Sequence, residues 1–393
     1  MNRLGSYDVI ILGAGAAGLM CALTAGQRGR KVLLLEHTDK VGAKILISGG
    51  GRCNFTNLAS GPDRFLSANP HFCTSALKRY TQSDFIALVR RHNIPFHEKT
   101  LGQLFCDGSA RAIVAMLLEE CAVGSVDLRL GTSVANVSRA DAFTVSTTLG
   151  DATAPSLVLA TGGLSIPKMG ATGFSYQLAG KFGLAVTQTL PGLVPLKASA
   201  ENAHFFSELA GVSLDAIAAY GDKSFRENIL FTHRGLSGPA ILQISSYWRQ
   251  GQPITLDLVP NTEPGFLISA KHARPKTSLQ TILADVLPGR LAQALAHDHQ
   301  GSKDMANIPD RTCAAIETRI KAWKFSPQAS EGYAKAEVTA GGIDTRELSS
   351  KTMEARRVPG LYAIGEAVDV TGWLGGYNFQ WAWSSGWSAG QAV

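Results

Sequence analysis

The chain has 393 residues, of which 45% are hydrophobic and 17% charged, and its formal net charge is +6. This length and composition exclude a disordered chain and predict two or more domains with a large buried core. The basic residues are scattered, without a long Lys/Arg block interleaved with aromatic residues, so nucleic-acid binding is not indicated. No run of eighteen apolar residues is present that would cross a membrane, and we expect a cytoplasmic protein.

Residues 9–36 predict a strand, a tight glycine turn, a helix and a second strand that ends on an acid. In the turn GAGAAG, Gly13 makes the bend and Gly15 lets backbone amides approach a pyrophosphate, while Gly18 lets the helix pack close to the sheet. Glu36 can accept hydrogen bonds from an adenosine ribose and would repel a 2′-phosphate. The pattern therefore predicts a dinucleotide site, against the alternative of a glycine turn without a nucleotide. It leaves open whether the dinucleotide is NAD or FAD.

The next segment, KILISGGGRCN from Lys44 to Asn54, predicts a polar, glycine-rich loop that suits a pyrophosphate or a flavin face. Disulfide reductases carry a CxxxxC pair near this point, but here Cys53 stands alone. A dithiol relay is therefore excluded, and Cys53 is either a packing thiol or a reactive one. None of the six cysteines forms a CxxC pair, which argues against a zinc site and favours reduced thiols.

The remaining periodicities predict elements in the following order. Helices are expected at Ala76–Arg91 and Ser109–Cys121, short strands within 126–149, and a buried strand at Leu157–Ala160. Residues 196–260 predict short strands interrupted by one helix beginning at Pro239, and residues 262–325 predict helices. From Ala336 the chain returns to strands and glycine-rich loops and ends in a helix, Gln380–Ala392.

Two motifs near the C-terminus favour FAD over NAD. An apolar strand delivers Gly365-Glu366, and this carboxylate is suited to a ribityl chain, which NAD lacks; an ordinary strand ending in an exposed acid is the alternative. Gly375-Gly376 precede the last helix, whose first amides would stabilise negative charge on a reduced flavin. Earlier in the chain, Thr161-Gly162 follows a strand and would let a planar ligand lie against the backbone.

With these residues in view, the chain resembles the BaiN/YhiN-like family of FAD-dependent oxidoreductases, also labelled aminoacetone oxidase-like. The resemblance covers nearly the full length, and it rests on GAGAAG, KILISGGGRCNFTN, PKMGATG, FTHRGLSGPAIL, AEVTAGGI, LYAIGEAVDVTG and GGYNFQWA. It implies an α/β fold with a discontinuous, Rossmann-like FAD-binding domain of the glutathione-reductase superfamily. It further implies an inserted β-barrel-like domain that carries a helical subdomain.

From the motifs and the resemblance we expect three regions: an FAD-binding domain at 1–193 and 334–393, an inserted β-rich domain at 194–261 and 326–333, and a helical subdomain at 262–325. The residues assigned to the FAD site are Gly13, Gly15, Ala16, Ala17, Gly18, Glu36, His37, Lys44, Ser48, Gly49, Gly50, Arg52, Cys53, Asn54, Val134, Ala160, Thr161, Gly162, Gly341, Gly365, Glu366, Gly375, Gly376, Tyr377, Asn378 and Gln380. No metal site is expected, because His297 and His299 at i,i+2 spacing point to different sides of a helix.

A candidate substrate site lies in the segment FTHRGLSGP, where Pro239 marks a helix start. His233 and Arg234 would add donors near the positive end of that helix, and we hypothesise that they hold an anionic or carbonyl group of the substrate. The alternative is a structural cap.

The leading functional hypothesis is an FAD oxidoreductase that transfers a hydride between flavin and a small organic substrate, with NAD(P)H or dioxygen as the second partner. No second strand–GxGxxG–helix unit is present, so NAD(P)H would bind only transiently. The alternatives are an FAD-dependent enzyme that modifies nucleic acid such as tRNA, and a non-catalytic flavin-binding protein. The leading hypothesis expects no nucleic-acid partner and no membrane. The substrate and the oligomeric state stay open.

Overall fold

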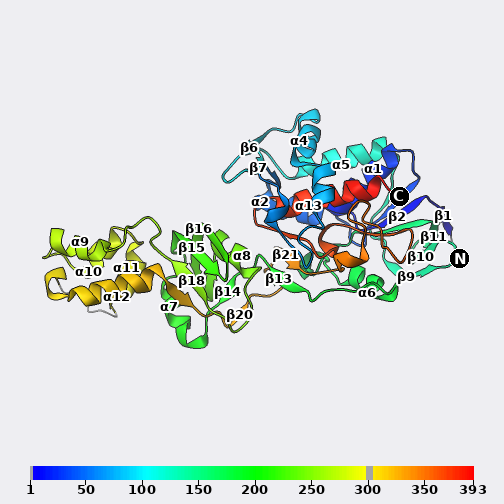
Figure 1. Ribbon diagram of the computed structural model, residues 1–393. Coiled ribbons are helices and arrows are strands. Elements are labelled where there is room, and N and C mark those ends of the chain that lie inside the picture. The colour runs from blue at the N-terminus through cyan, green and yellow to red at the C-terminus, as the bar shows by residue number, and fades with distance from the viewer. Residues whose placement is uncertain (1–2, 298–303) are drawn as a thin grey trace. The chain divides into compact units, whose positions relative to one another are not determined.

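The computed structural model describes residues 3–297 and 304–393 (Figure 1). The chain forms two compact units: unit 1 comprises the residues up to Leu190 together with Val338–Val393, and unit 2 comprises Pro191–Glu337. Unit 1 is thus made of two segments that flank unit 2 in the sequence, the order expected when one domain is inserted into another. The expected boundaries at 193 and 334, and the division of unit 2 into two parts, stay predictions.

Unit 1 is built on a five-stranded sheet whose neighbouring strands all run parallel. In spatial order its strands are β22 (Leu361–Ala363), β12 (Ser156–Leu159), β2 (Val9–Leu12), β3 (Val32–Leu35) and β8 (Asp127–Arg129). The strands β2 and β3 are buried at every position; α1 packs against both strands, and β11 of a second sheet contacts β2. The sequence predictions of β2 and β3 are confirmed.

Two helices distant in sequence pack in close contact in unit 1: α1 (Ala16–Gln27) and α13 (Tyr377–Gly390) (Figure 1). Glycines allow this approach. A Cβ added at Gly386 would lie 2.5 Å from the carbonyl oxygen of Ala17, and one added at Gly390 would lie 2.8 Å from that of Cys21. The side chain of Arg28 holds the chain end by donating to the Gly390 and Val393 carbonyls. The C-terminal helix therefore completes the core of the nucleotide-binding unit.

The other elements of unit 1 are smaller. Its further helices are α2 (Ala43–Gly51), α3 (Thr74–Arg79), α4 (Gln82–Arg91), α5 (Arg111–Val123) and α6 (Phe174–Lys181). Its further strands are β1 (Arg3–Ser6), β4 (Asn54–Asn57), β5 (Phe65–Leu66), β6 (Phe96–Glu98), β7 (Gln103–Cys106), β9 (Val134–Arg139), β10 (Phe143–Thr147), β11 (Gly150–Ala154) and β23 (Thr371–Gly372). At the two crossings between the units lie β13 (Leu190–Gly192) and β21 (Val338–Ala340).

The prediction of a single helix at Ala76–Arg91 is wrong, because the helical conformation is interrupted between α3 and α4. Thr81 adopts an extended conformation and forms a capping box with Asp84, which starts a new helix. The final helix begins at Tyr377, three residues before the predicted start. The strands expected within 126–149 are confirmed as β8, β9 and β10.

Unit 2 contains a seven-stranded antiparallel sheet. In spatial order its strands are β19 (Trp323–Phe325), β18 (Ile254–Asp257), β15 (Ser213–Tyr220), β16 (Lys223–Thr232), β17 (Gly235–Ser237), β14 (Leu196–Lys197) and β20 (Ala329–Ser330). Along β16, the buried side chains of Phe225, Ile229 and Phe231 lie two or four residues apart, as expected for one face of a strand. The helix α8 (Pro239–Ser245) packs on β15 and β16 and begins at Pro239, as predicted.

The remaining helices of unit 2 are α7 (Ala203–Glu208), α9 (Phe266–Ala273), α10 (Leu279–Ala284), α11 (Gly289–His297) and α12 (Asp310–Lys321). The prediction of one helix within 196–260 is therefore wrong, since α7 precedes α8. The helical character of 262–325 is confirmed. The predicted α/β class is also confirmed, and no helix in residues 3–297 and 304–393 has the length and apolarity needed to cross a membrane.

Candidate functional site

The glycine turn between β2 and α1 has the geometry expected of a pyrophosphate cradle. Gly13 has a φ of +106°, and a Cβ at Gly18 would lie 1.9 Å from the carbonyl oxygen of Gly13, so the helix packs directly on the turn. A Cβ at Gly15, in contrast, would meet no atom within 4 Å. Gly15 caps α1, so the first amides of this helix, including those of Ala16 and Ala17, face a position that favours anions.

Glu36 lies directly after β3, beside this turn. Its Oε2 accepts a hydrogen bond from the backbone amide of Ala14 at 3.0 Å, and its Oε1 accepts from the Thr38 amide at 2.9 Å. The Nδ1 of His37 is 3.0 Å from the same Oε1. These contacts hold the carboxylate at the carboxyl end of the strand and leave an acceptor position on Oε2 for a ribose hydroxyl.

The first part of the segment predicted as a glycine-rich loop is helical: α2 begins at Ala43, whereas the backbone of Ser48, Gly49 and Gly50 is non-helical. The loop prediction is therefore wrong for residues 44–47. Gly49 packs against the ring of Phe105, whereas a Cβ at Gly50 would meet no atom within 4 Å. The hydroxyl of Ser48 donates to the Ile45 carbonyl, so it stabilises the end of the helix rather than pointing a free donor outward.

Three further predicted residues of this segment differ in their surroundings. Arg52 is exposed. The amide group of Asn54 lies 3.2 Å from that of Gln103. Cys53 is fully buried, and burial raises the pKa of its thiol to about 12, so the thiol is neutral at physiological pH. This environment favours the packing interpretation of Cys53 over the reactive one.

Lys44 and Glu366, which are 322 residues apart, form the central polar contact of the site. Lys44 Nζ lies 2.6 Å from Glu366 Oε2 and 2.5 Å from the hydroxyl of Ser165. Ser165 in turn donates to Glu366 Oε1 at 2.8 Å, and the Thr339 amide donates to the same oxygen at 2.9 Å. Three donors thus occupy the carboxylate and leave one acceptor position on Oε2. The expected contact of this oxygen with a ribityl hydroxyl stays a prediction.

Ser165 and Thr339 were missed by the sequence reasoning. Thr339 lies within the quoted motif AEVTAGGI, and Ser165 follows the small residues after β12, so both had a signal in their neighbours. Their role emerges only from the contact with Glu366, because no local spacing relates residues 165, 339 and 366.

The glycine pair before α13 also adopts the required conformation. Gly375 and Gly376 have φ values of +111° and +95°, and Gly376 caps the helix. The side chains that follow are used by the fold: Asn378 bonds to the Gly372 amide and carbonyl, and Gln380 is fully buried and contacts Thr56 and Ser384. The first backbone amides of this helix, those of Tyr377 and Asn378 among them, are suited to a cofactor.

Small residues follow the other strand ends. Ala160 and Thr161 come after β12, and a Cβ at Gly162, whose φ is +74°, would meet no atom within 4 Å. Gly365 packs against Ala17 of α1. A Cβ added at Gly341 would lie 2.2 Å from the backbone carbonyl oxygen of Gln188. Gly341 is therefore needed because the two backbone segments pass close to each other.

Val134, assigned to the FAD site, begins β9 and is half-buried. Predicted residues follow the carboxyl ends of four strands of the parallel sheet, β2, β3, β12 and β22, at the edge where α/β folds bind ligands. Their chemistry fits FAD: a helix start for the pyrophosphate, an acid for the ribose, a second acid for the ribityl chain, and open backbone at Gly15, Gly50 and Gly162.

His233 and Arg234 belong to unit 2 and have a different setting from the predicted one. They form the turn between β16 and β17, whose terminal residues Thr232 and Gly235 pair with each other. The strand β17 separates them from Pro239, so they do not lie at the start of α8, and that part of the hypothesis is wrong. Both side chains are exposed. Their catalytic role stays a prediction.

All six cysteines are buried and unpaired. Within residues 3–297 and 304–393, His, Cys, Asp and Glu side chains form no group of three that could hold a metal. His299 lies outside the described residues, so the expectation for the His297 and His299 pair is not examined by the structure.

The parallel sheet, the glycine turn and the two acids Glu36 and Glu366 define an FAD-dependent oxidoreductase with a Rossmann-like FAD-binding domain. The chain belongs to the HI0933-like protein Rossmann domain family, whose sequence pattern matches residues 7–392. The resemblance drawn from the sequence motifs is thus confirmed.

Three relatives match nearly the whole chain. It is 51% identical to the ribosomal RNA dihydrouridine synthase of Escherichia coli (strain K12) over 98% of this chain and 97% of the relative. It is 46% identical to the protein of the same name from Haemophilus influenzae, over 98% of each chain. It is 30% identical to the 3-dehydro-bile acid delta(4,6)-reductase of Clostridium scindens, over 100% of this chain and 99% of the relative.

Solved structures with the same fold include two steroid enzymes. A 3-ketosteroid delta1-dehydrogenase from Sterolibacterium denitrificans matches with a TM-score of 0.53 and 15% identity over 98% of this chain and 99% of that one. A 3-ketosteroid-delta4-(5alpha)-dehydrogenase from Rhodococcus jostii RHA1 matches with a TM-score of 0.52 and 16% identity over 99% and 98%. These likenesses support the fold, and the full-length relatives support an enzyme.

Proposed function

We propose that this enzyme reduces uridine to 5,6-dihydrouridine in ribosomal RNA, with FAD as its redox cofactor. The observation that carries the proposal is the 51% and 46% identity to two ribosomal RNA dihydrouridine synthases over 98% of the chain. That match extends through both units, so the similarity is not limited to the cofactor-binding turn. The proposal replaces the expectation of a small-molecule substrate and no nucleic acid, and it names ribosomal RNA where the sequence-based alternative named tRNA.

The chemistry is that of a polarised carbon–carbon double bond. In uracil the C5=C6 bond is conjugated with the C4 carbonyl, so a hydride adds at C6 and a proton adds at C5. The name of the Clostridium scindens relative likewise describes a reductase of double bonds in a 3-oxo compound. Reduction of a double bond activated by a carbonyl therefore accounts for relatives with very different substrates.

The residues of unit 1 have separate tasks in this proposal. The amides at the start of α1 bind the pyrophosphate, and Glu36 binds the adenosine ribose. Glu366 accepts from the ribityl chain while Lys44 and Ser165 hold it in place. The amides at the start of α13 would stabilise negative charge on the flavin when FAD is bound. FAD supplies the hydride, and NAD(P)H is the proposed source of reducing equivalents.

A second candidate is reduction of a small organic enone. The 30% identity to the bile acid reductase over the full chain favours this candidate. It gives a substrate class and a direction to the leading sequence hypothesis, which named only a small organic substrate. The two candidates differ in substrate and share the same carbon–carbon reduction.

The decisive experiment is complementation. An Escherichia coli strain that lacks the gene of the 51% identical relative is supplied with this chain, and its ribosomal RNA is digested to nucleosides for mass spectrometry. We expect dihydrouridine to return. The matched control is the Glu36→Lys variant, which reverses the charge beside the ribose and should lose FAD and activity.

A purified reaction extends this test. The FAD-loaded enzyme, NADPH or NADH, and ribosomal RNA from the deletion strain should yield dihydrouridine under nitrogen. Complementation without dihydrouridine, together with NADPH-dependent reduction of an enone, would transfer the proposal to the small-molecule candidate. A bound flavin that neither donor bleaches would instead favour a non-catalytic flavin protein.

A further inference from the structure

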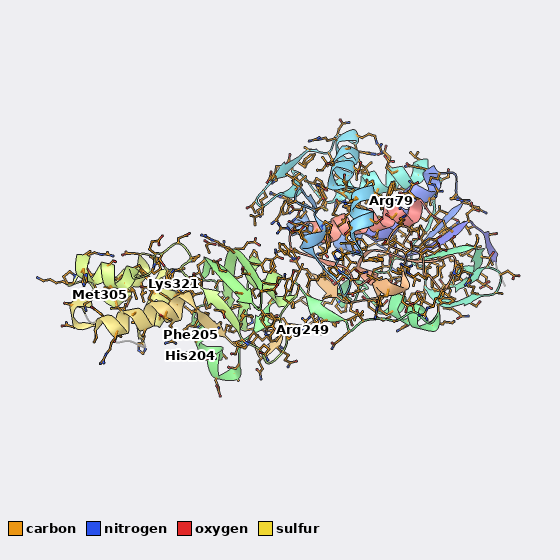
Figure 2. The ribbon with its side chains drawn as sticks, in the orientation of Figure 1. Arg79, His204, Phe205, Arg249, Met305 and Lys321 are labelled. Carbon is orange, nitrogen blue, oxygen red and sulfur yellow. The ribbon has the colours of Figure 1, made fainter. Side chains whose placement is uncertain are left out.

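Unit 2 carries a surface pocket of about 510 Å³, all of whose lining residues belong to this unit. Its polar lining comes from Lys197, Ser199, His233, Arg234, Gln250 and Gln328. Among the lining residues that the structure describes there is no aspartate or glutamate. Figure 2 labels Arg249, an exposed side chain that directly precedes Gln250. The pocket thus gathers hydrogen-bond donors and positive charge in a volume typical of ligand sites.

Main-chain pairing of three distant segments fixes the frame of this pocket. The strand β14 lies between β17 and β20, with Lys197 opposite both Gly235 and Ala329. The Ala198 amide donates to the Arg234 carbonyl at 2.8 Å, and the Gln328 amide donates to the Lys197 carbonyl at 2.9 Å. Lys197 and Ala329 therefore lie in paired strands, and main-chain hydrogen bonds hold Arg234 and Gln328 beside β14.

Gly235 explains how the turn with Arg234 approaches β14 so closely. Its φ is +147°, and an added Cβ would lie 2.3 Å from the Leu196 carbonyl oxygen. Thr232 Oγ1 accepts a hydrogen bond from the Arg234 amide at 3.2 Å and donates to the Gly235 carbonyl. The two-residue turn is thus held at both ends while its side chains stay exposed.

The side chain of Arg234 keeps most of its hydrogen-bonding capacity. The side chain of Arg234 is 58% exposed, and its ion pair with Glu331 has an N···O distance of 3.7 Å, which is long for a hydrogen bond. A guanidinium has five donors, so a bidentate pair of N–H groups is left for a ligand. An ammonium, an imidazole, a hydroxyl and two amides complete the donor set.

We propose that this pocket binds a phosphodiester group and the adjoining nucleotide of the RNA substrate. A phosphate takes several donors at once and prefers arginine, whereas a metal cation needs acidic ligands that the lining lacks. The proposal rests on the proposed function, since it assigns binding of the RNA strand to unit 2 and reduction of the uracil ring to unit 1. It gives His233 and Arg234 a binding role in place of a catalytic one.

The test measures binding of a fluorescein-labelled single-stranded RNA to the FAD-loaded full chain by anisotropy over a range of salt. We expect Arg234→Ala and Lys197→Ala each to weaken binding about tenfold. Each should also reduce the slope of log Kd against log salt by about 0.7, the value for one phosphate contact on a single strand. The KM for RNA should rise while the KM for NADPH stays unchanged.

Lys223→Ala is the matched control, because Lys223 begins the same strand whose far end leads to the pocket turn. It removes the same charge about 30 Å away along the strand, and it should leave RNA binding unchanged. Thermal unfolding and FAD content of each variant show that the fold is intact.

The outcomes separate the two proposals. Wild-type affinity and salt slope in both pocket variants would overturn the pocket assignment even if dihydrouridine forms normally. A raised KM for NADPH with unchanged RNA binding would also overturn it, and would assign the phosphate site to the dinucleotide donor. Loss of RNA binding in the variants, combined with absence of dihydrouridine in the wild-type reaction, would support the pocket and refute the proposed reaction.

Discussion

An added methyl group should have different effects at two glycines of one turn, lowering the stability of the fold at Gly18 and the affinity for the cofactor at Gly15. At Gly18 the new Cβ would lie 1.9 Å from the carbonyl oxygen of Gly13, well inside a normal contact, and the atom it meets is backbone. At Gly15 the new Cβ would meet no protein atom within 4 Å, and the φ of −82° is acceptable for alanine. We therefore expect Gly18→Ala to damage the fold and Gly15→Ala to damage only cofactor binding.

The magnitudes follow from these contacts. Relief of the Gly18→Ala clash requires α1 to move by about 1 Å, and overpacking of this kind costs about 1–3 kcal/mol. In a domain of this size the melting temperature falls by about 2–4 °C per kcal/mol. Gly15→Ala should leave the apo melting temperature unchanged. It should weaken FAD binding by at least about tenfold, because the methyl group displaces the pyrophosphate from charge-assisted hydrogen bonds worth about 1.5–3 kcal/mol each.

Differential scanning fluorimetry of the apo proteins and fluorescence titration with FAD measure both effects. Gly108→Ala is a control for an added methyl group at an exposed position, since no atom lies within 4 Å of its Cβ and its φ is not in the left-handed region. Wild-type FAD affinity in Gly15→Ala would refute the location of the pyrophosphate. Wild-type stability in Gly18→Ala would refute the packing argument.

Three other predictions concern single side chains. The Arg346 hydrogen bond holds the pKa of Asp344 below its usual range, so this carboxylate stabilises the fold above about pH 4, and the contribution disappears as pH falls through the lowered pKa. Asp344→Asn should therefore lower the free energy of unfolding in urea by about 1 kcal/mol at pH 7, a small effect because the Arg346 side chain is largely exposed to solvent. This difference from the wild type should shrink towards pH 3, and an equal difference at all pH values would contradict the prediction. Since burial raises the pKa of Cys53 to about 12, Cys53→Ala should keep turnover within about twofold and the same pH profile from 6 to 9, and a change in that profile would show a reactive thiol. Glu366→Gln should shift the midpoint potential of the bound flavin to more positive values in a dye-linked titration, because Lys44 then keeps an unbalanced positive charge; an unchanged potential would place the flavin elsewhere.

Much of the nucleotide site was predictable because its signals are local. The turn from Gly13 to Gly18 and the strands on either side follow from glycine spacing and apolar runs, and both strands were predicted with the observed bounds. Errors arose where one local signal opposed another. Gly49 and Gly50 suggested a loop, yet the apolar residues before them form a helix, and the capping box at Thr81 divides a stretch of continuous helical periodicity.

The side chains of the C-terminal motif have a structural role that the sequence did not show. Asn378 and Gln380 were assigned to the FAD site in a segment whose backbone amides were expected to face the flavin. Their hydrogen bonds run instead to Gly372 and Thr56, because α13 is packed inside unit 1 and its polar groups need partners there. A sequence pattern does not tell whether a buried polar side chain faces a ligand or the protein.

The sequence by itself determined the βαβ unit, the family and the preference for FAD, since these depend on spacings within short segments. Tertiary structure decided which distant residues meet. Lys44 reaches Glu366 only because α2 and the end of β22 lie at one edge of the parallel sheet, and Lys197 joins Arg234 and Gln328 only because β14 pairs with both β17 and β20. Such contacts depend on strand order and register, and these are set by the packing of the whole core rather than by any local pattern.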